Sequence, residues 1–126
     1  MATDNLSRRE RQIMDLLYRS APVGAAEIRK GLPDPPTYSA VRAMLSTLER
    51  KGHVRHAEKG LRYVYSPVVS RDRAMHRAVS HLMDTFFRGS VESAVAALLD
   101  ARSGKLSREE LDRLAKMIER ARREGR

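Results

Sequence analysis

The chain has 126 residues, 33% charged and 41% hydrophobic, which suits one domain or two small ones and excludes a large enzyme. Its 25 lysines and arginines against 16 acidic residues give a net charge of +9, which favours a polyanionic partner such as nucleic acid or an acidic membrane surface. The absence of cysteine excludes disulfide scaffolds, thiol nucleophiles and thiolate metal sites.

No apolar run approaches the about 20 residues that a membrane span requires. The first residues, Met1 to Asn5, are polar and lack the apolar segment of a signal peptide. We therefore expect a cytoplasmic protein that does not insert into a lipid membrane.

The chain begins with two predicted helices. Ser7, with Glu10 three residues later, is a capping-box signature for a helix that should end before Pro22. A second, shorter helix fits residues 25–30 and is ended by Gly31.

A third helix is predicted after the proline-rich turn at residues 33–36, which cannot be helix interior. Thr37 or Ser39 caps it, and Gly52 ends it. One buried face follows from apolar residues at three- and four-residue spacing, namely Val41, Met44, Leu45 and Leu48.

The pattern then changes from helical to alternating. Residues 53–57 and 62–66 are typical of two strands, and Glu58-Lys59-Gly60 is the expected hairpin turn. Pro67 ends the second strand.

The remaining residues are helical throughout. One helix runs from Ser70 toward Gly89, the next is capped by Ser90, and the last begins at Ser107 with Glu110 as a second capping box. Their apolar stripes are too extensive for isolated surface helices, so we expect them to bury against a second copy of the chain. The alternative is that they pack back on the N-terminal domain. The predicted dimer residues are Met75, Val79, Leu82, Met83, Phe86, Val95, Leu98, Leu111, Leu114 and Ile118.

Three helices followed by a two-strand hairpin is the order of a winged helix-turn-helix. The sequence thus predicts a mainly α fold with a small β-hairpin wing, as a DNA-binding domain at residues 1–69 and a three-helix dimerisation domain at 70–126. In such proteins the recognition helix enters the major groove, N-terminal residues first. The helix at about 37–51 and the wing at about 53–67 should therefore contact DNA.

The candidate DNA-binding side chains are hydroxyls and cations that can reach bases or phosphates. Thr37 and Ser39 have an alternative role as helix caps, Tyr38 could pack under the proline-rich turn, and Arg50 could complement the helix C-terminus. The candidates are Thr37, Tyr38, Ser39, Arg42, Arg50, Lys59 and Arg62.

The run from Thr37 to Gly52 resembles the recognition helix of the BlaI/MecI/CopY family of penicillinase repressors, which typically shows Tyr-(Ser/Thr)-Thr-Val, then spaced leucines, then Lys-Gly before the wing. Further similarities lie in the first helix (Leu6-Ser7, Ile13-Met14), in Arg62-Tyr63-Val64-Tyr65 of the wing, and at the start of the last helix from Lys105 to Leu111. The resemblance covers roughly residues 6–121.

The resemblance implies a homodimeric transcriptional repressor that binds palindromic operator DNA. Carried over from the family, the contact positions are Tyr38, Ser39, Ala40 and Arg42, with Lys59 and Arg62 in the wing. Ala40 departs from the threonine usual in the family, which puts the operator sequence in doubt.

The branches of the family differ in how repression ends. Copper-responsive members carry a cysteine-rich tail, which this chain lacks. The β-lactam-responsive members are inactivated by proteolysis near the C-terminal helices after a signal from a membrane sensor protease. The matching stretch here is Ala94 to Asp100, where Ala97-Leu98 is not the polar–aromatic pair of the best-known members.

Nothing in the sequence indicates catalysis. We find no phosphate-binding glycine loop, nucleophile–base pair or cofactor signature. The four histidines, His53, His56, His76 and His81, do not have good metal-ligand spacing. We expect no enzyme, no metal and no cofactor. The rival functions are a sequence-neutral basic DNA-binding protein and a protein-interaction winged helix.

Overall fold

The computed structural model describes residues 6–125. Residues 1–5, on which the expectation of no signal peptide rests, lie outside the described residues. The chain divides into two compact units, Met1–Ala78 and Val79–Arg126, and the divide falls within a helix, α4 (Arg71–Phe86). The predicted domain boundary between residues 69 and 70 lies shortly before this helix and stays a prediction.

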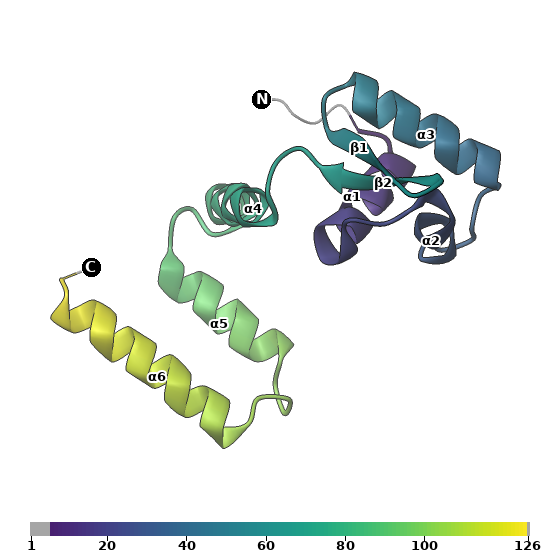
Figure 1. Cartoon of the computed structure of the whole chain (residues 1–126). Helices are drawn as coiled ribbons and strands as arrows, with labels where there is room; N and C mark the ends of the chain where they lie inside the picture. The colour runs from purple at the N-terminus through teal and green to yellow at the C-terminus, as the bar shows by residue number, and fades with distance from the viewer. Residues whose placement is uncertain (1–5, 126) are drawn as a thin grey trace. The chain divides into compact units, whose positions relative to one another are not determined.

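The predicted order of elements is confirmed (Figure 1). Three helices lead into an antiparallel hairpin, and three more helices follow. Besides α4, the elements are α1 (Arg8–Ser20), α2 (Ala25–Lys30), α3 (Tyr38–Arg50), β1 (Val54–Lys59), β2 (Arg62–Pro67), α5 (Val91–Ala101) and α6 (Arg108–Arg123).

Side chains cap the helices where the sequence predicts. At α1, the Glu10 amide donates to Ser7 Oγ at 3.1 Å and the Ser7 amide donates to Glu10 Oε1 at 2.8 Å, which is a complete capping box. At α6, Ser107 Oγ accepts from the Glu110 amide at 3.0 Å. Such caps satisfy amides that the first helical turn leaves without a partner.

The first unit has its own apolar core beneath α1, α2 and α3. Of the predicted buried face of α3, Val41, Leu45 and Leu48 are fully buried and Met44 is half-buried against the core. The other core side chains that are at most 1% exposed in the three helices are Ile13, Leu17 and Ile28. Each such side chain contributes about 1.5–3 kcal/mol by leaving water. This core fixes how α3 is rotated about its own axis.

The hairpin turn is shorter than predicted. Glu58 and Lys59 belong to β1, and Lys59 pairs with Arg62, so the turn consists of Gly60 and Leu61. Gly60 has a φ of 68°, a left-handed conformation that glycine adopts without steric cost. Lys59 is therefore the last residue of β1, at the tip of the wing, and is not a turn residue as predicted.

One buried ion pair joins the start of α1 to the end of α3. Glu10 is 6% exposed, and Lys51 Nζ lies 3.0 Å from Glu10 Oε1. Burial acts to raise the pKa of Glu10, but the hydrogen bond from the Ser7 amide and the Lys51 ammonium outweigh it and hold this pKa below its ordinary value. The carboxylate thus caps one helix and anchors another.

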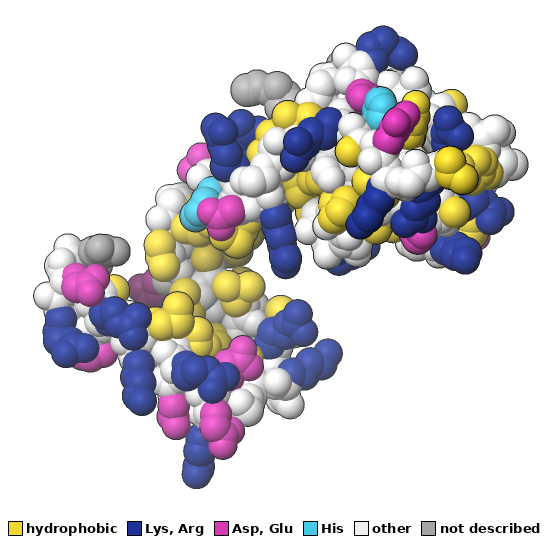
Figure 2. All heavy atoms as spheres, in the orientation of Figure 1, with side chains coloured by type: hydrophobic (Ala, Val, Ile, Leu, Met, Phe, Trp, Pro, Cys, Tyr) yellow, Lys and Arg dark blue, Asp and Glu magenta, His cyan; other side chains and the backbone are white. Residues whose placement is uncertain are grey.

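The second unit exposes much of its apolar surface. Its buried residue, among those described, is Ala94. Figure 2 shows hydrophobic side chains gathered around α5, bordered by charged ones. No helix within residues 6–125 has the length and apolar character needed to cross a bilayer.

Replacement of Glu10 by glutamine should lower the free energy of unfolding at pH 7 by about 1–3 kcal/mol, because Lys51 and the Ser7 amide lose a charged acceptor. The folded pKa lies below the unfolded value of about 4.3. The carboxylate therefore stabilises the fold above that value, and its contribution is lost as the pH falls through the folded pKa. The difference between wild type and Glu10→Gln should accordingly shrink on acidification.

Urea unfolding followed by tyrosine fluorescence measures this difference, because all four tyrosines (18, 38, 63 and 65) lie in the first unit. Glu58→Gln, at an exposed position of β1, is the matched control and should change little. A Glu10→Gln protein as stable as wild type at pH 7 would contradict the assigned role of the carboxylate.

Candidate nucleic-acid interface

The outer face of α3 consists of residues on the side opposite the core. Val41, Leu45 and Leu48 are fully buried, and a helix turns by about 100° per residue, so positions about half a turn away face outward. All members of this outer face are exposed: Ser39, Arg42, Ala43, Ser46 and Arg50. It offers hydroxyls, two guanidinium groups and one small side chain that permits close approach.

The structure gives the predicted residues of α3 different surroundings. Thr37 is the N-cap, since its Oγ1 accepts from the Ala40 amide at 3.1 Å. Tyr38 is 49% exposed, so it is not packed away under the proline-rich turn. Ala40 is half-buried, whereas Ser39 lies on the outer face.

Arg42 lies beside two tyrosines. Its guanidinium carbon lies 5.8 Å from the centre of the Tyr38 ring, close enough for a cation–π contact. Interaction with Tyr38, and then with Tyr65, raises the pKa of Arg42 above its ordinary value. Burial raises the pKa of Tyr65, although the charge of Arg42 opposes that rise. Arg42 is therefore a permanent cation whose direction is restricted by aromatic neighbours.

His56 joins the wing to α3. Its Nδ1 lies 2.8 Å from Glu49 Oε1, and its ring stacks on Tyr63 with centres 4.3 Å apart. Tyr65, opposite His56 in the hairpin, lies 6.1 Å away between ring centres. The bond to Glu49 joins the hairpin to α3, and the two tyrosine rings hold the histidine within the hairpin.

Arg62, a predicted phosphate contact of the wing, is already held by α2. Its Nη1 donates to Glu27 Oε2 at 2.8 Å, and Glu27 Oε1 accepts from the Gly24 amide at 3.0 Å. The hydrogen bond from Arg62 is the main cause of a lowered pKa of Glu27. A Cβ at Gly24 would lie 2.7 Å from Glu27 Oε1 and 3.1 Å from Arg62 Nη1, so glycine leaves room for this pair.

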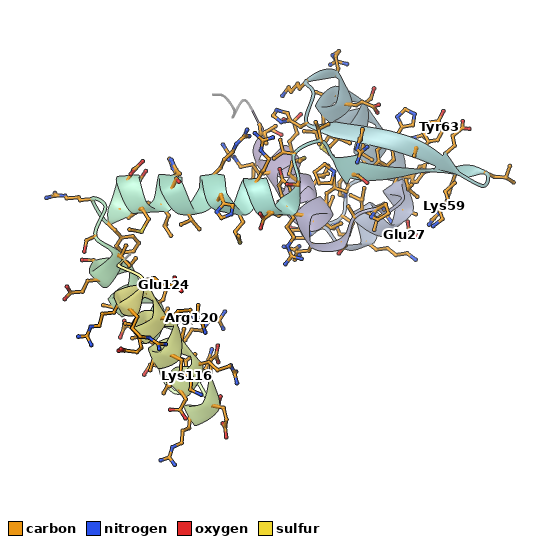
Figure 3. The ribbon with its side chains drawn as sticks, turned by 60° about the vertical axis from the view of Figure 1, so that its left-hand side comes forward. Glu27, Lys59, Tyr63, Lys116, Arg120 and Glu124 are labelled. Atoms are coloured by element: carbon orange, nitrogen blue, oxygen red, sulfur yellow. The ribbon has the colours of Figure 1, made fainter. Side chains whose placement is uncertain are left out.

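Lys59 is exposed at the end of β1, next to the two-residue turn. It pairs with Arg62 across the hairpin, so both side chains lie on one face and Tyr63 on the other. Figure 3 shows Lys59 and Tyr63 on the wing, with Glu27 on α2.

A shallow depression of about 280 Å³ lies where α2, α3 and the wing meet. Its lining combines two arginines, three tyrosines, the leucine of the wing turn and the start of α2: Arg42, Arg62, Tyr38, Tyr63, Tyr65, Leu61, Gly24, Ala25 and Ala26. A positively charged, aromatic surface of this kind suits the sugar–phosphate backbone of a nucleic acid.

The sequence interpretation missed Ala43 and Ser46, although both lie on the outer face with Arg42. Helical rotation counted from the buried leucines would have found them. It also missed Glu27, Tyr63 and Tyr65, whose role depends on contacts between distant elements and carries no local signal.

Solved structures with a similar fold include a protein in complex with DNA. Streptococcus pneumoniae FabT in complex with DNA has a TM-score of 0.53 at 19% identity, covering 94% of this chain and 75% of that one. Two variants of Lactococcus lactis ZitR have TM-scores of 0.53 and 0.51 at 16% identity, covering 100% of this chain and 80% of theirs. At these identities the likeness shows the fold alone.

No curated protein matches the chain. A family model described as penicillinase repressor, however, matches residues 6–120, nearly the whole chain. The resemblance seen in the recognition helix and wing is thereby confirmed. The chain belongs to the penicillinase repressor family, whose members are winged-helix, DNA-binding transcriptional repressors.

Proposed function

We propose that the protein is a homodimeric repressor that binds a palindromic operator, with α3 in the major groove and the wing on the sugar–phosphate backbone. The observation that carries this proposal is the outer face of α3, which sets hydroxyls and guanidinium groups beside a basic wing. Hydroxyls and arginines are suited to hydrogen-bonding base edges and phosphates in that groove.

Individual roles follow from the geometry. Ser39 and Arg42, early in α3, are the proposed base contacts, with Tyr38 beside them. Lys59 and Arg62 are proposed phosphate contacts, although Arg62 must share its donors with Glu27. Thr37 and Ala40 support the helix start more than they contact DNA, because one is the cap and the other is half-buried.

We favour sequence-specific binding over the alternative of a basic protein that binds DNA without sequence preference. The net charge of +9 would serve either function. A protein that coats DNA without sequence preference needs no ordered recognition surface. Here the hydrogen bond between Glu49 and His56 joins α3 to the wing, and stacking on Tyr63 holds the histidine ring within the hairpin. The FabT structure, a complex with DNA on a similar fold, supports DNA as the partner.

A two-fold dimer is supported by the apolar stripes of the C-terminal helices. Met75, Val79 and Leu82 of α4 are 43–50% exposed, and Phe86 is 69% exposed. Further exposed members are Val91, Val95, Leu98, Leu99, Leu111, Met117 and Ile118. Apolar side chains exposed in such numbers mark an interface between proteins, and a two-fold dimer matches the symmetry of a palindromic operator.

Release of the operator by proteolysis belongs to the same proposal and rests on the family resemblance. The matching stretch, residues 94–100, lies within α5. A protease requires an extended strand, so cleavage there needs α5 to unwind locally. A cut would separate dimer helices from the winged helix and leave each copy with one half-site.

Arg42→Ala should weaken binding to a selected operator duplex by at least about ten-fold, since each half-site loses a charged contact in the groove. Arg120→Ala removes the same charge from α6, an element of the second unit that is not part of the proposed interface. A gel-shift titration at fixed salt compares the two. Equal losses would show that the interface is misassigned.

Leu82→Asp or Phe86→Asp should convert the dimer to a monomer, because a carboxylate would lie in the apolar seam without a partner. Operator affinity should fall while the first unit stays folded. His81→Asp, beside Leu82 but off the stripe, is the matched control and should remain dimeric. Analytical ultracentrifugation decides the matter: a wild type that is monomeric at micromolar concentration, or a dimeric Leu82→Asp, would refute the seam.

A further inference from the structure

The segment between α2 and α3, residues 31–37, is poor in its own hydrogen bonds. Pro33, Pro35 and Pro36 have no amide hydrogen, so they cannot donate within the turn. Asp34 has a φ of 45°, a left-handed conformation that is uncommon outside glycine. Leu32 anchors the start of the segment in the core, and side chains from other elements hold the part from Pro33 to Pro36 that leads into α3.

Arg9 of α1 binds the first half of this segment. Its Nη1 donates to the Pro33 carbonyl at 2.6 Å and its Nη2 to the Asp34 carbonyl at 2.5 Å. Gln12, one turn further along α1, accepts from the same Nη1 at 3.1 Å. Two nitrogens of one planar guanidinium thus fix two successive carbonyls, a geometry that lysine cannot reproduce.

Arg29 of α2 binds the second half. Its Nε donates to the Pro36 carbonyl at 2.6 Å. Pro36 directly precedes Thr37, the N-cap of α3, so this bond orients the peptide from which the helix begins. Hydrogen bonds from a charged donor are short and stronger than neutral ones.

We propose that Arg9 and Arg29 are positioning residues for DNA binding, which act by fixing the N-terminus of α3 without contacting DNA. This inference rests on the proposed function, because it assumes that α3 reads the operator. The two side chains come from different helices and engage both halves of the segment. The first turn of α3, with Tyr38 and Ser39, thereby depends on two arginines that lie outside it.

The proposal separates two roles that a basic residue can have in a DNA-binding protein. A phosphate contact releases counterions, so its loss reduces the slope of log affinity against log salt by about one per contact. A positioning residue changes the affinity and leaves that slope as it was. The salt slope is therefore the deciding readout.

The first arm measures binding to a fluorescent duplex that wild-type protein has selected from a randomised library, over a range of salt concentrations. Arg9→Lys keeps the positive charge but loses the two guanidinium nitrogens that bind successive carbonyls. Arg29→Met removes both the charge and the Nε donor. Each should lower affinity about ten-fold with the wild-type salt slope. The matched controls, Arg11→Lys on α1 and Lys30→Met on α2, should stay within about two-fold of wild type.

The second arm uses amide hydrogen exchange of the free protein and needs no DNA. The Ala40 and Val41 amides, which donate to Thr37 Oγ1 and to the Thr37 carbonyl, should exchange faster in Arg29→Met. The Leu45 and Leu48 amides should keep their protection, which also shows that the unit is folded. If wild type selects no duplex, the proposed function fails while this arm still tests the fixing of the helix start.

Three results would overturn the proposal. The first is wild-type affinity in both variants. The second is a salt slope of Arg29→Met reduced by about one per protomer, which would make Arg29 a phosphate contact; Arg9→Lys keeps its charge and is judged by its affinity. The third is an equal loss of affinity in the controls, which would reduce the effect to overall charge. Because Arg9→Lys and Arg29→Met probe the same segment independently, failure of one to fold leaves the other as the test.

Discussion

The burial of one side of α3 determines what the first unit can present to a partner. Val41, Leu45 and Leu48 are fully buried in the core, where α3 packs against α2 and β1. A rotation of α3 that carried Arg42 into the core would bury an unpaired charge, which is strongly unfavourable. Core packing therefore determines which residues of α3 form the outer face, whether or not nucleic acid is bound.

Acidic residues determine which basic side chains of the first unit remain available to bind nucleic acid. Three glutamates each hold a basic group on another element of the first unit, so part of the positive charge maintains the fold. The pairs are Glu10 with Lys51, Glu27 with Arg62, and Glu49 with His56. The two exposed pairs, Glu27–Arg62 and Glu49–His56, add little stability, whereas Glu10 is buried in its pair with Lys51. Their effect is to orient the wing and α3, so that Arg42 and Lys59 face outward from a defined frame.

Most of the fold could be predicted because its signals are local. Capping signals, glycine stops and apolar spacing lie within a few residues of each other. The sequence therefore predicts the caps Ser7 and Ser107 and the buried positions Val41, Leu45 and Leu48 correctly. The complete capping box is found at Ser7, whereas Ser107 caps α6 through its own side chain, and Met44 is half-buried. The hairpin turn was misplaced because cross-strand pairing between Lys59 and Arg62, and not the local sequence, decides where β1 ends.

The candidate interface was less predictable than the helices, because contacts between distant residues determine it. The exposed residues of α3 follow from helical rotation, but their supports come from distant parts of the chain. Arg9 reaches the turn at Pro33, and Glu27 reaches Arg62 of the wing. No local sequence pattern predicts such contacts, because they form only when core packing brings the elements together. Likewise, the exposed apolar side chains of α4, α5 and α6 indicate that another protein surface covers these helices. That this surface is a second copy of the chain follows from the two-fold symmetry of the proposed operator.

The central claim is that two copies of α3 lie in the major groove of one symmetric site. The chain has no cysteine, so Ala43→Cys provides a single attachment point for an iron–EDTA group at an exposed position on the outer face. On a selected duplex, the account predicts two clusters of backbone cleavage related by two-fold symmetry, about one helical turn of 10 base pairs or a multiple of it apart. Cleavage spread evenly along the duplex, or confined to one cluster, would contradict it.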